Sequence, residues 1–386
     1  MIFSPLSEIA QVGRNIPYIV SFVAFLIVSI GICFADNFAA LVVLRFFQGV
    51  FGSPILASGG ASLGDIYDWD LAPYAFVFWI AAMYSGPALG PLLSAYAVPH
   101  HWRWPLWEIL LMSVPIFILT MISLPETAPH KILLQRAQRL RALTGNQQFR
   151  AKTELHNLQL GPYIMDAMNK PLEIMIKDPC ITFAGVYGSL VYATYYSFFE
   201  SFPLVYQGTY RLSGGSMAQI FLCVIVGCII GGLLYSAWLF FIFNPQNKRT
   251  PMTYEARLRP GLPAVFILPI GLFLFAWTSR RDIHWIVPTV GVTIYAATSF
   301  VVFQCLMCYI PLSYPRYVAS LLAGNDFFRS TLAAGFVMFS RAMYLSLGIA
   351  KGVTVLGGLS IMGILGLVYL YYYGAALRAR SRFAEG

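Results

Sequence analysis

The feature that most constrains this chain is a succession of long apolar stretches that are nearly free of Asp, Glu, Lys and Arg. About 20 consecutive apolar residues are needed to cross the hydrocarbon core of a bilayer, and the stretches reach that length. The whole chain is 58% hydrophobic and only 11% charged, with a mean hydropathy of +0.69. These values exclude an ordinary cytosolic protein and indicate a polytopic membrane protein.

The stretches predict an all-α membrane protein with about ten transmembrane helices. Backbone groups at bilayer depth must be hydrogen-bonded within their own segment, which favours helices. The sequence lacks the alternating strands of about ten residues that a β-barrel needs. The expected limits of the helices are 17–35, 38–63, 72–97, 105–124, 180–206, 215–243, 261–279, 284–311, 316–341 and 346–373.

An even number of spans places both termini on the same side, and the basic residues indicate which side. With cytoplasmic termini, the inner segments carry seventeen of the 25 Lys and Arg residues: one before the first span, eight within 131–177, four within 248–259, one at 316 and three in the tail. The positive-inside rule therefore predicts cytoplasmic termini. The net charge of +9 then reflects topology and lipid contact rather than nucleic-acid binding.

The long polar segment 125–178 divides the chain into a bundle of four spans, residues 1–124, and a bundle of six spans, residues 179–386. Within this segment, residues 131–143 place apolar and basic side chains on different helical faces. We expect either a basic amphipathic helix on the anionic inner leaflet or a linker helix that packs on the cytoplasmic face of the bundle.

No cofactor, metal or catalytic group is predicted. The six cysteines lie in or beside apolar segments, which predicts free, buried thiols. The histidines do not have the spacing of metal ligands. The sequence contains no phosphate-binding Gly-rich loop with Lys and Ser/Thr, so it does not encode ATP hydrolysis. We therefore do not expect an enzyme.

The third span contains two Gly-Pro dipeptides four residues apart, Gly86-Pro87 and Gly90-Pro91. Small residues at this spacing favour the close approach of another helix, and each proline makes the helix more bendable by removing a backbone donor. We interpret the two dipeptides as a functional packing device, with generic small-residue packing as the alternative.

Two charged features involve the first two spans. Arg45 lies about 12 Å from the outer end of the second span at 1.5 Å per residue, so it is expected to face a cavity or a partner, or else to snorkel outward. Before the first span, Glu8 leads to a turn at Gly13 and to Arg14. Arg14 can reach an acid at the cytoplasmic end of a neighbouring helix, and Asp65, at the end of the second span, is a candidate.

Together these pieces resemble the major facilitator superfamily, in particular its fungal drug:proton antiporters. Residues 5–14 are similar to the family's loop between helices 2 and 3, and residues 44–49 to its helix 4 motif, whose arginine is implicated in proton coupling. Residues 86–91 resemble the antiporter motif of helix 5, which is associated with export. The resemblance implies a twelve-helix fold of which this sequence lacks the first two helices.

Further stretches are similar to fungal multidrug and cycloheximide-type exporters, so the resemblance covers nearly the whole chain. They are residues 124–127, 137–146, 195–203, 271–278 and 323–330.

Asp326 and Arg329 lie near the middle of the ninth span, three residues apart, so they can pair on one helix face. One interpretation is a pair that only neutralises itself. The other is that the two residues, beside Asn325, belong to a cavity whose charges change partners during transport.

Glu200 lies near the outer end of the fifth span, after rings that can contact an apolar or cationic solute. An acid beside rings suits a cationic substrate or a titrating proton site. An interfacial aromatic belt is the alternative interpretation of the rings. The ring cluster comprises Tyr192, Tyr195, Tyr196 and Phe199.

The preferred function is proton-driven export of an amphipathic organic compound such as a drug, a toxin or a secondary metabolite. The alternatives are a nutrient or polyamine transporter of the same fold, and a truncated or degenerate copy that transports nothing. The expected partners are a small-molecule substrate, protons and the lipid bilayer, without nucleic acid. We expect a monomer in the plasma membrane, with the vacuolar membrane as the alternative.

The charge distribution predicts that a tag at either terminus is accessible only from the cytoplasm. In sealed right-side-out vesicles, an added protease should remove neither tag until the membrane is permeabilised. A cysteine introduced by Ser213→Cys, in the loop of Arg211, should react with an impermeant thiol reagent from outside. Digestion of either tag in sealed vesicles would contradict the assigned topology.

Overall fold

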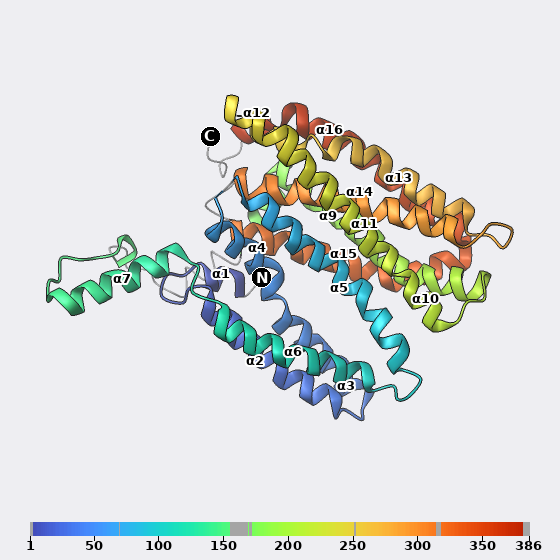
Figure 1. Ribbon diagram of the computed structural model, residues 1–386, viewed down its shortest axis with the longest axis horizontal. Helices are drawn as coiled ribbons and strands as arrows, with labels where there is room; N and C mark the ends of the chain where they lie inside the picture. The colour runs from blue at the N-terminus through green and yellow to red at the C-terminus, as the bar shows by residue number, and fades with distance from the viewer. Residues whose placement is uncertain are drawn as a thin grey trace. The chain divides into compact units, whose positions relative to one another are not determined.

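The computed structural model describes residues 3–68, 70–154, 169, 172–250, 252–313 and 318–380. The regular elements of these residues are all helices, which confirms the predicted all-α class. The helices form two compact units, and Figure 1 labels them along the chain. The first unit comprises Met1–Asp68, Ala97–Glu173 and Ala319–Gly324, and the second comprises Trp69–Tyr96, Ile174–Val318 and Asn325–Gly386.

In the first unit, α2 packs against both α3 and α6, with a small core of Ile32, Cys33, Leu106 and Leu110. Asn37 caps α3, because its side chain accepts a hydrogen bond from the backbone N–H of Ala39. The helices of this unit are α1 (Phe3–Ser7), α2 (Asn15–Cys33), α3 (Phe38–Gly52), α4 (Pro54–Ile66), α6 (Trp104–Ser123) and α7 (Pro129–Thr144), followed by the 3-10 turn Lys152–Glu154.

The second expected span, residues 38–63, corresponds to one candidate membrane span, Phe38–Ile66, whose helix is interrupted at Ser53. α3 ends at Gly52 and α4 begins at Pro54, whose ring removes a backbone donor and interrupts the helical ladder. The N–H of Leu56 instead bonds the carbonyl of Ser53 at 3.1 Å. The span was therefore predicted correctly, and the interruption before this proline was not predicted.

In the second unit, α14 packs against α11 and α13, and α13 packs against α16. α14 is the most buried of the helices that are apolar enough to span. The elements of this unit are α5 (Ala72–Ala97), α9 (Pro179–Phe202), a π-helical turn Pro203–Thr209, α10 (Gly214–Ile220), α11 (Leu222–Trp238), a second π-helical turn Leu239–Phe243, α12 (Asn244–Arg249), a 3-10 turn Tyr254–Leu258, α13 (Gly261–Thr278), α14 (Ile286–Ser313), α15 (Val318–Leu347) and α16 (Ile349–Arg380).

Helix α5 belongs to the second unit, although the sequence places it in the expected first bundle, residues 1–124. Side-chain hydrogen bonds explain the difference. Gln304 of α14 donates to the carbonyl of Pro73 at 2.9 Å, and the hydroxyl of Tyr195 of α9 donates to the carbonyl of Tyr84 at 3.0 Å. A helical carbonyl has a second lone pair that can accept such a bond, so α5 is joined to its neighbours by more than apolar contact.

Eight helices of the described residues are long and apolar enough to cross a membrane, and they match eight of the ten expected spans. The other two expected spans correspond to α9 and α15. α15 carries three charged side chains, and α9 carries many hydroxyls but buries most of its residues inside the second unit. Lys170, Arg316 and Arg382, which the charge count uses, lie outside the described residues. All six cysteines are free and buried, as predicted.

Glycines allow α14 to approach α11 and α13 closely. A Cβ atom on Gly231 of α11 would lie 2.6 Å from the carbonyl oxygen of Ala297 on α14. A Cβ atom on Gly271 of α13 would lie 2.8 Å from the carbonyl oxygen of Gly291, also on α14. In a membrane, where apolar burial gives little driving force between helices, such close backbone contact stabilises the bundle.

We predict that Gly231→Ala destabilises the protein, because the added methyl group overlaps with α14. Overpacking of this kind costs about 1–3 kcal/mol, so the thermal unfolding midpoint in detergent should fall by several degrees. Gly358→Ala is the matched control, since a Cβ atom there would meet open space within α16. Equal midpoints for the two variants would contradict the packing.

Candidate functional site

The centre of the site is an ion pair on α15. The guanidinium of Arg329 contacts the carboxylate of Asp326, one helical turn away, as the i, i+3 spacing predicted. The side chain of Arg329 is only 1% exposed and that of Asp326 is 17% exposed. The pair is therefore enclosed within the second unit.

Two rings and a sulfur atom surround the guanidinium. The Cζ atom of Arg329 lies 4.5 Å from the ring centre of Tyr192 on α9 and 5.0 Å from that of Phe303 on α14. Its Nη1 donates to Sδ of Met83 on α5 at 3.2 Å. A desolvated cation–π contact contributes about 2 kcal/mol, so α5, α9 and α14 all stabilise one side chain of α15.

Polar atoms beside the pair have no hydrogen-bond partner among the described residues. They are the side-chain oxygen and nitrogen of Asn325, Oδ2 of Asp326 and Nε of Arg329. Leaving a buried polar group unpaired costs about 1–3 kcal/mol. The site thus has spare hydrogen-bonding capacity for a ligand, a water molecule or a second arrangement of the pair.

The aromatic cluster of α9 continues from this pair. The ring of Tyr84 on α5 lies 6.5 Å from that of Tyr192 and 5.4 Å from that of Tyr195. The hydroxyl of Tyr192 donates to that of Tyr196 at 3.1 Å, and the rings of Tyr196 and Phe199 are 5.5 Å apart. Tyr192 and Tyr195 are buried in the unit, unlike the lipid-facing rings of an interfacial belt.

Glu200 has a basic partner that sequence reasoning missed. Its Oε2 lies 3.9 Å from Nη1 of Arg341 on α15, and the two side chains are 24% and 65% exposed respectively. The sequence did show an arginine, Arg341, inside the ninth span, but it does not show which helix faces that arginine. The structure thus pairs Glu200 and Asp326 with two different arginines of α15.

In the first unit, Arg14 joins the loop before α2 to the end of α4. Its Nε contacts the carboxylate of Asp65, as predicted, and its Nη1 donates to Oγ of Ser7 at 3.3 Å. Gly13 forms the expected turn with a φ of 70°. Glu8 lies directly after α1 in the same loop.

Glu126 is a further member of this group that sequence reasoning did not single out. Its carboxylate accepts hydrogen bonds from the backbone N–H groups of Arg14 at 2.9 Å and Asn15 at 3.4 Å. A Cβ atom on Gly13 would overlap with that carboxylate, so this turn requires glycine for space as well as for φ. The sequence signals are an acid that follows the proline at the end of the fourth span and its place in residues 124–127, which resemble fungal exporters.

Arg45 has a partner within its own unit. Its Nη1 donates to Oε1 of Gln48 at 3.1 Å, and Nε2 of Gln48 donates to Oγ of Ser29 on α2 at 2.8 Å. The Arg45 side chain is otherwise exposed on the first unit. The structure therefore gives Arg45 a polar partner on α3 and, through Gln48, a link to α2.

The Gly-Pro dipeptides lie within a continuous α5, with Pro87 and Pro91 inside the helix. Within the second unit, no described atom lies within 4 Å of a Cβ atom built on Gly86 or Gly90. The close helix contact expected at these glycines is not formed inside this unit. Within this unit, a methyl group at either position would meet open space.

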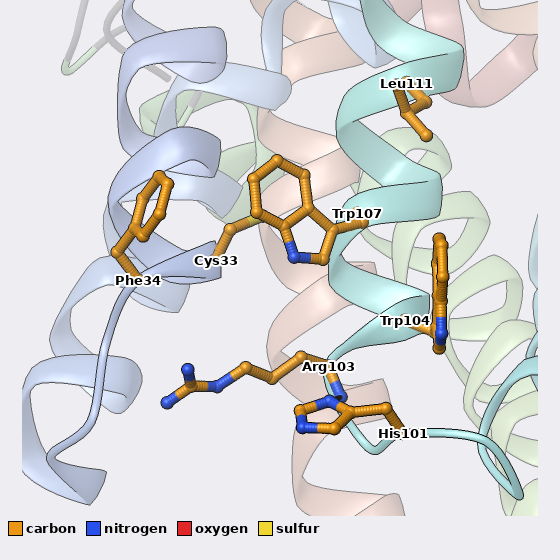
Figure 2. Close-up of a pocket in the computed structure, with 7 residues that line it drawn as sticks. All are labelled: Cys33, Phe34, His101, Arg103, Trp104, Trp107 and Leu111. Carbon is orange, nitrogen blue, oxygen red and sulfur yellow. Dashed lines mark hydrogen bonds between the residues drawn. The ribbon is translucent and has the colours of Figure 1, made fainter.

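A hollow of about 580 Å³ lies in the first unit between the end of α2 and the start of α6, as Figure 2 shows. Arg103 at this hollow forms an ion pair with Asp36 and donates to the carbonyl of Ala35 at 3.3 Å. Tryptophan and arginine at a span's end are typical of membrane-interface anchoring, so we assign the hollow no part in transport. Its lining residues are Cys33, Phe34, His101, Arg103, Trp104, Trp107 and Leu111.

We predict that Asp326→Asn destabilises the protein more than Glu200→Gln does. Asp326→Asn leaves the buried Arg329 without a counter-charge, which costs roughly 3–5 kcal/mol. The arginine of the Glu200 pair is 65% exposed and the two charged atoms are 3.9 Å apart, and exposed pairs contribute roughly 0–1 kcal/mol. Thermal unfolding midpoints in detergent should differ accordingly.

The double variant Asp326→Asn/Arg329→Gln should recover part of the loss, because it removes the unpaired charge. Strictly additive losses in the double variant would show that the two residues are not coupled.

Known proteins resemble this chain over its full length. The sequence profile of the Major Facilitator Superfamily matches residues 1–336. The MFS-type transporter pyvG of Aspergillus violaceofuscus is 43% identical over 389 residues, which cover 100% of this chain and 72% of that protein. The cycloheximide resistance protein of Candida maltosa is 35% identical over 398 residues, which cover 100% of this chain and 72% of that protein.

The fold is also found among solved structures. The human organic anion transporter MFSD10 (TETRAN) matches with a TM-score of 0.64 at 16% identity, over 95% of this chain and 79% of that chain. At this identity the likeness shows the fold alone. With a profile match over most of its length and two relatives above 30% identity, the chain belongs to the major facilitator superfamily.

Proposed function

We propose that the protein exports amphipathic organic compounds, such as a drug, a toxin or a secondary metabolite, in exchange for protons. The observation that carries the proposal is the buried pair of Asp326 and Arg329, which is surrounded by rings and by polar atoms without partners. The similarity to a cycloheximide resistance protein supports export of a small organic molecule. The protein is an integral, multi-pass membrane protein of a transporter family.

Alternating access would move one helix bundle against the other around a central cavity. An acid inside the membrane that is charged in one state and protonated in the other can bias this movement. Protonation of Asp326 would free Arg329 from its carboxylate and leave the guanidinium against Tyr192 and Phe303. Glu200, whose pair with Arg341 is more accessible, is the second proton-binding candidate.

The substrate would lie against ring faces and use the free hydrogen-bonding atoms. Tyr192, Tyr195, Tyr196 and Phe199 supply the ring surface, and the side chain of Asn325 can donate and accept. This combination suits an amphipathic solute better than a fully hydrated nutrient.

Residues outside this cavity would control the movement. In the first unit, Arg45 would contribute to proton coupling, while the loop group of Glu8, Gly13, Arg14 and Asp65 would stabilise one state at the cytoplasmic side. In α5, the flexible segment of Gly86, Pro87, Gly90 and Pro91 would bend or make new contacts during the cycle.

We also propose that the protein works as a monomer in the plasma membrane with both termini in the cytoplasm. The excess of Lys and Arg in the segments assigned to the cytoplasm supports the orientation.

The test is transport of radiolabelled cycloheximide by the purified protein in liposomes, with the cytoplasmic face outward and an acidic lumen. The proton gradient should drive accumulation, and a protonophore should abolish it. Asp326→Asn should reduce gradient-driven accumulation at least about tenfold, a difference of roughly 1.4 kcal/mol. Glu200→Gln should reduce it less, because its pair is more exposed.

Asp36→Asn is the control, since this acid is 87% exposed beside the outer hollow and should not affect transport. Unchanged accumulation in both acid variants would refute their assigned roles. Accumulation that required an alkaline lumen would favour an importer.

A further inference from the structure

Helix α7 has two faces with different surroundings. On one face, Leu134 and Ala137 pack with Ala151 of the following loop. Nη2 of Arg141 lies 2.6 Å from the carboxylate of Glu154, which also accepts from the N–H of Ala151 at 2.9 Å. The hydrogen bond from Arg141 lowers the pKa of the Glu154 carboxyl below its ordinary value. This face is therefore already covered by its own segment.

The opposite face is apolar, basic and uncovered. Leu133, Leu140 and Leu143 are 55%, 43% and 84% exposed. Arg136 shares their face, because positions 133, 136, 140 and 143 follow the helical period, and Arg139 lies at its edge. Both arginines are exposed, and no acid pairs with either in the described part of the chain.

The chain places this face close to the bilayer. α6 ends at Ser123 and α7 begins at Pro129, so only five residues connect a spanning helix to α7. Five residues reach at most about 17 Å when fully extended. Leucines that insert at the boundary between headgroups and acyl chains, with arginines beside phosphates, are the pattern of an interfacial helix.

We propose that this face of α7, formed by Leu133, Arg136, Arg139, Leu140 and Leu143, binds the anionic surface of the inner leaflet. The proposal uses the charge-based topology, which places residues 125–178 in the cytoplasm, but not the transport mechanism. Of the two interpretations of this segment, the structure favours the lipid surface, because the face that packs on protein is a different one.

Lipid binding at α7 would act on the Arg14 loop. Nζ of Lys131, in the first turn of α7, donates to the carbonyl of Gln11, and Glu126 lies three residues before α7 and binds the backbone of Arg14. The headgroup composition of the inner leaflet would then affect the loop that we assign to conformational control.

The experiment uses the full chain with the substitution Leu143→Cys, and a fluorophore is attached to the new cysteine. Leu143 is a suitable position because its side chain is mostly exposed. The six native cysteines are buried. The labelled protein is placed in nanodiscs of phosphatidylcholine alone or with about one third phosphatidylserine. A nitroxide-labelled lipid serves as the quencher. Quenching should be stronger in the anionic discs and should decrease at high salt.

Arg136→Gln and Arg139→Gln should each weaken the bound state about fivefold, and the double variant Arg136→Gln/Arg139→Gln roughly 25-fold, since a basic residue near an anionic surface contributes about 1 kcal/mol. The control is Arg150→Gln/Lys152→Gln, which removes the same charge from exposed positions outside α7. The control pair should keep quenching near that of the parent protein.

Three results would overturn the proposal. The first is equal quenching in neutral and anionic discs, and the second is no quenching in either, which means that the label is shielded from lipid. The third is an equal loss of quenching in the two double variants. Size-exclusion profiles and unfolding midpoints would verify that every variant remains folded.

Discussion

A charged side chain inside a bilayer must have a partner, and the pair of Asp326 and Arg329 is where this requirement organises the second unit. The guanidinium is stabilised by the carboxylate on its own helix and by Tyr192, Phe303 and Met83 from three others. Removing the charge from water is costly, so these contacts must form together. The same pair gives α5, α9, α14 and α15 a common centre, and the proposed transport cycle uses it as a charge that changes partners.

Charged side chains of the first unit also have partners, but the partners are of different kinds. Arg14 is satisfied by Asp65 at the end of α4, while Glu126 binds backbone N–H groups rather than a side chain. Arg45 relies on Gln48, a neutral partner. Ion pairs and polar chains thus supply contacts between helices that the hydrophobic effect cannot supply in lipid, and close glycine packing around α14 supplies the rest.

Polar clusters in which some atoms lack hydrogen-bond partners suit a different role from clusters in which most atoms are hydrogen-bonded. The loop group around Arg14 is densely hydrogen-bonded, which suits one stable arrangement. The group of Asn325, Asp326 and Arg329 has buried donors and acceptors without partners among the described residues, which suits exchange between partners. Outside the spans, α7 shows the same contrast between a covered face and an uncovered one, and the uncovered face matches the surface of the membrane itself.

The sequence by itself determined the all-helical class and the approximate limits of the spans, and it indicated that Asp326 can pair with Arg329 and that Asp65 is a candidate partner of Arg14. Span limits depend on local hydropathy, the first pair on helical spacing, and the second on an acid where a span ends. Only the tertiary structure decided that Arg341 faces Glu200, that Met83 and Phe303 contact Arg329, and that α5 packs in the second unit. These contacts join residues far apart in the chain, and nothing local records which helix faces meet. Hydropathy likewise missed the break at Pro54, because the apolar pattern continues through a proline that interrupts the helix.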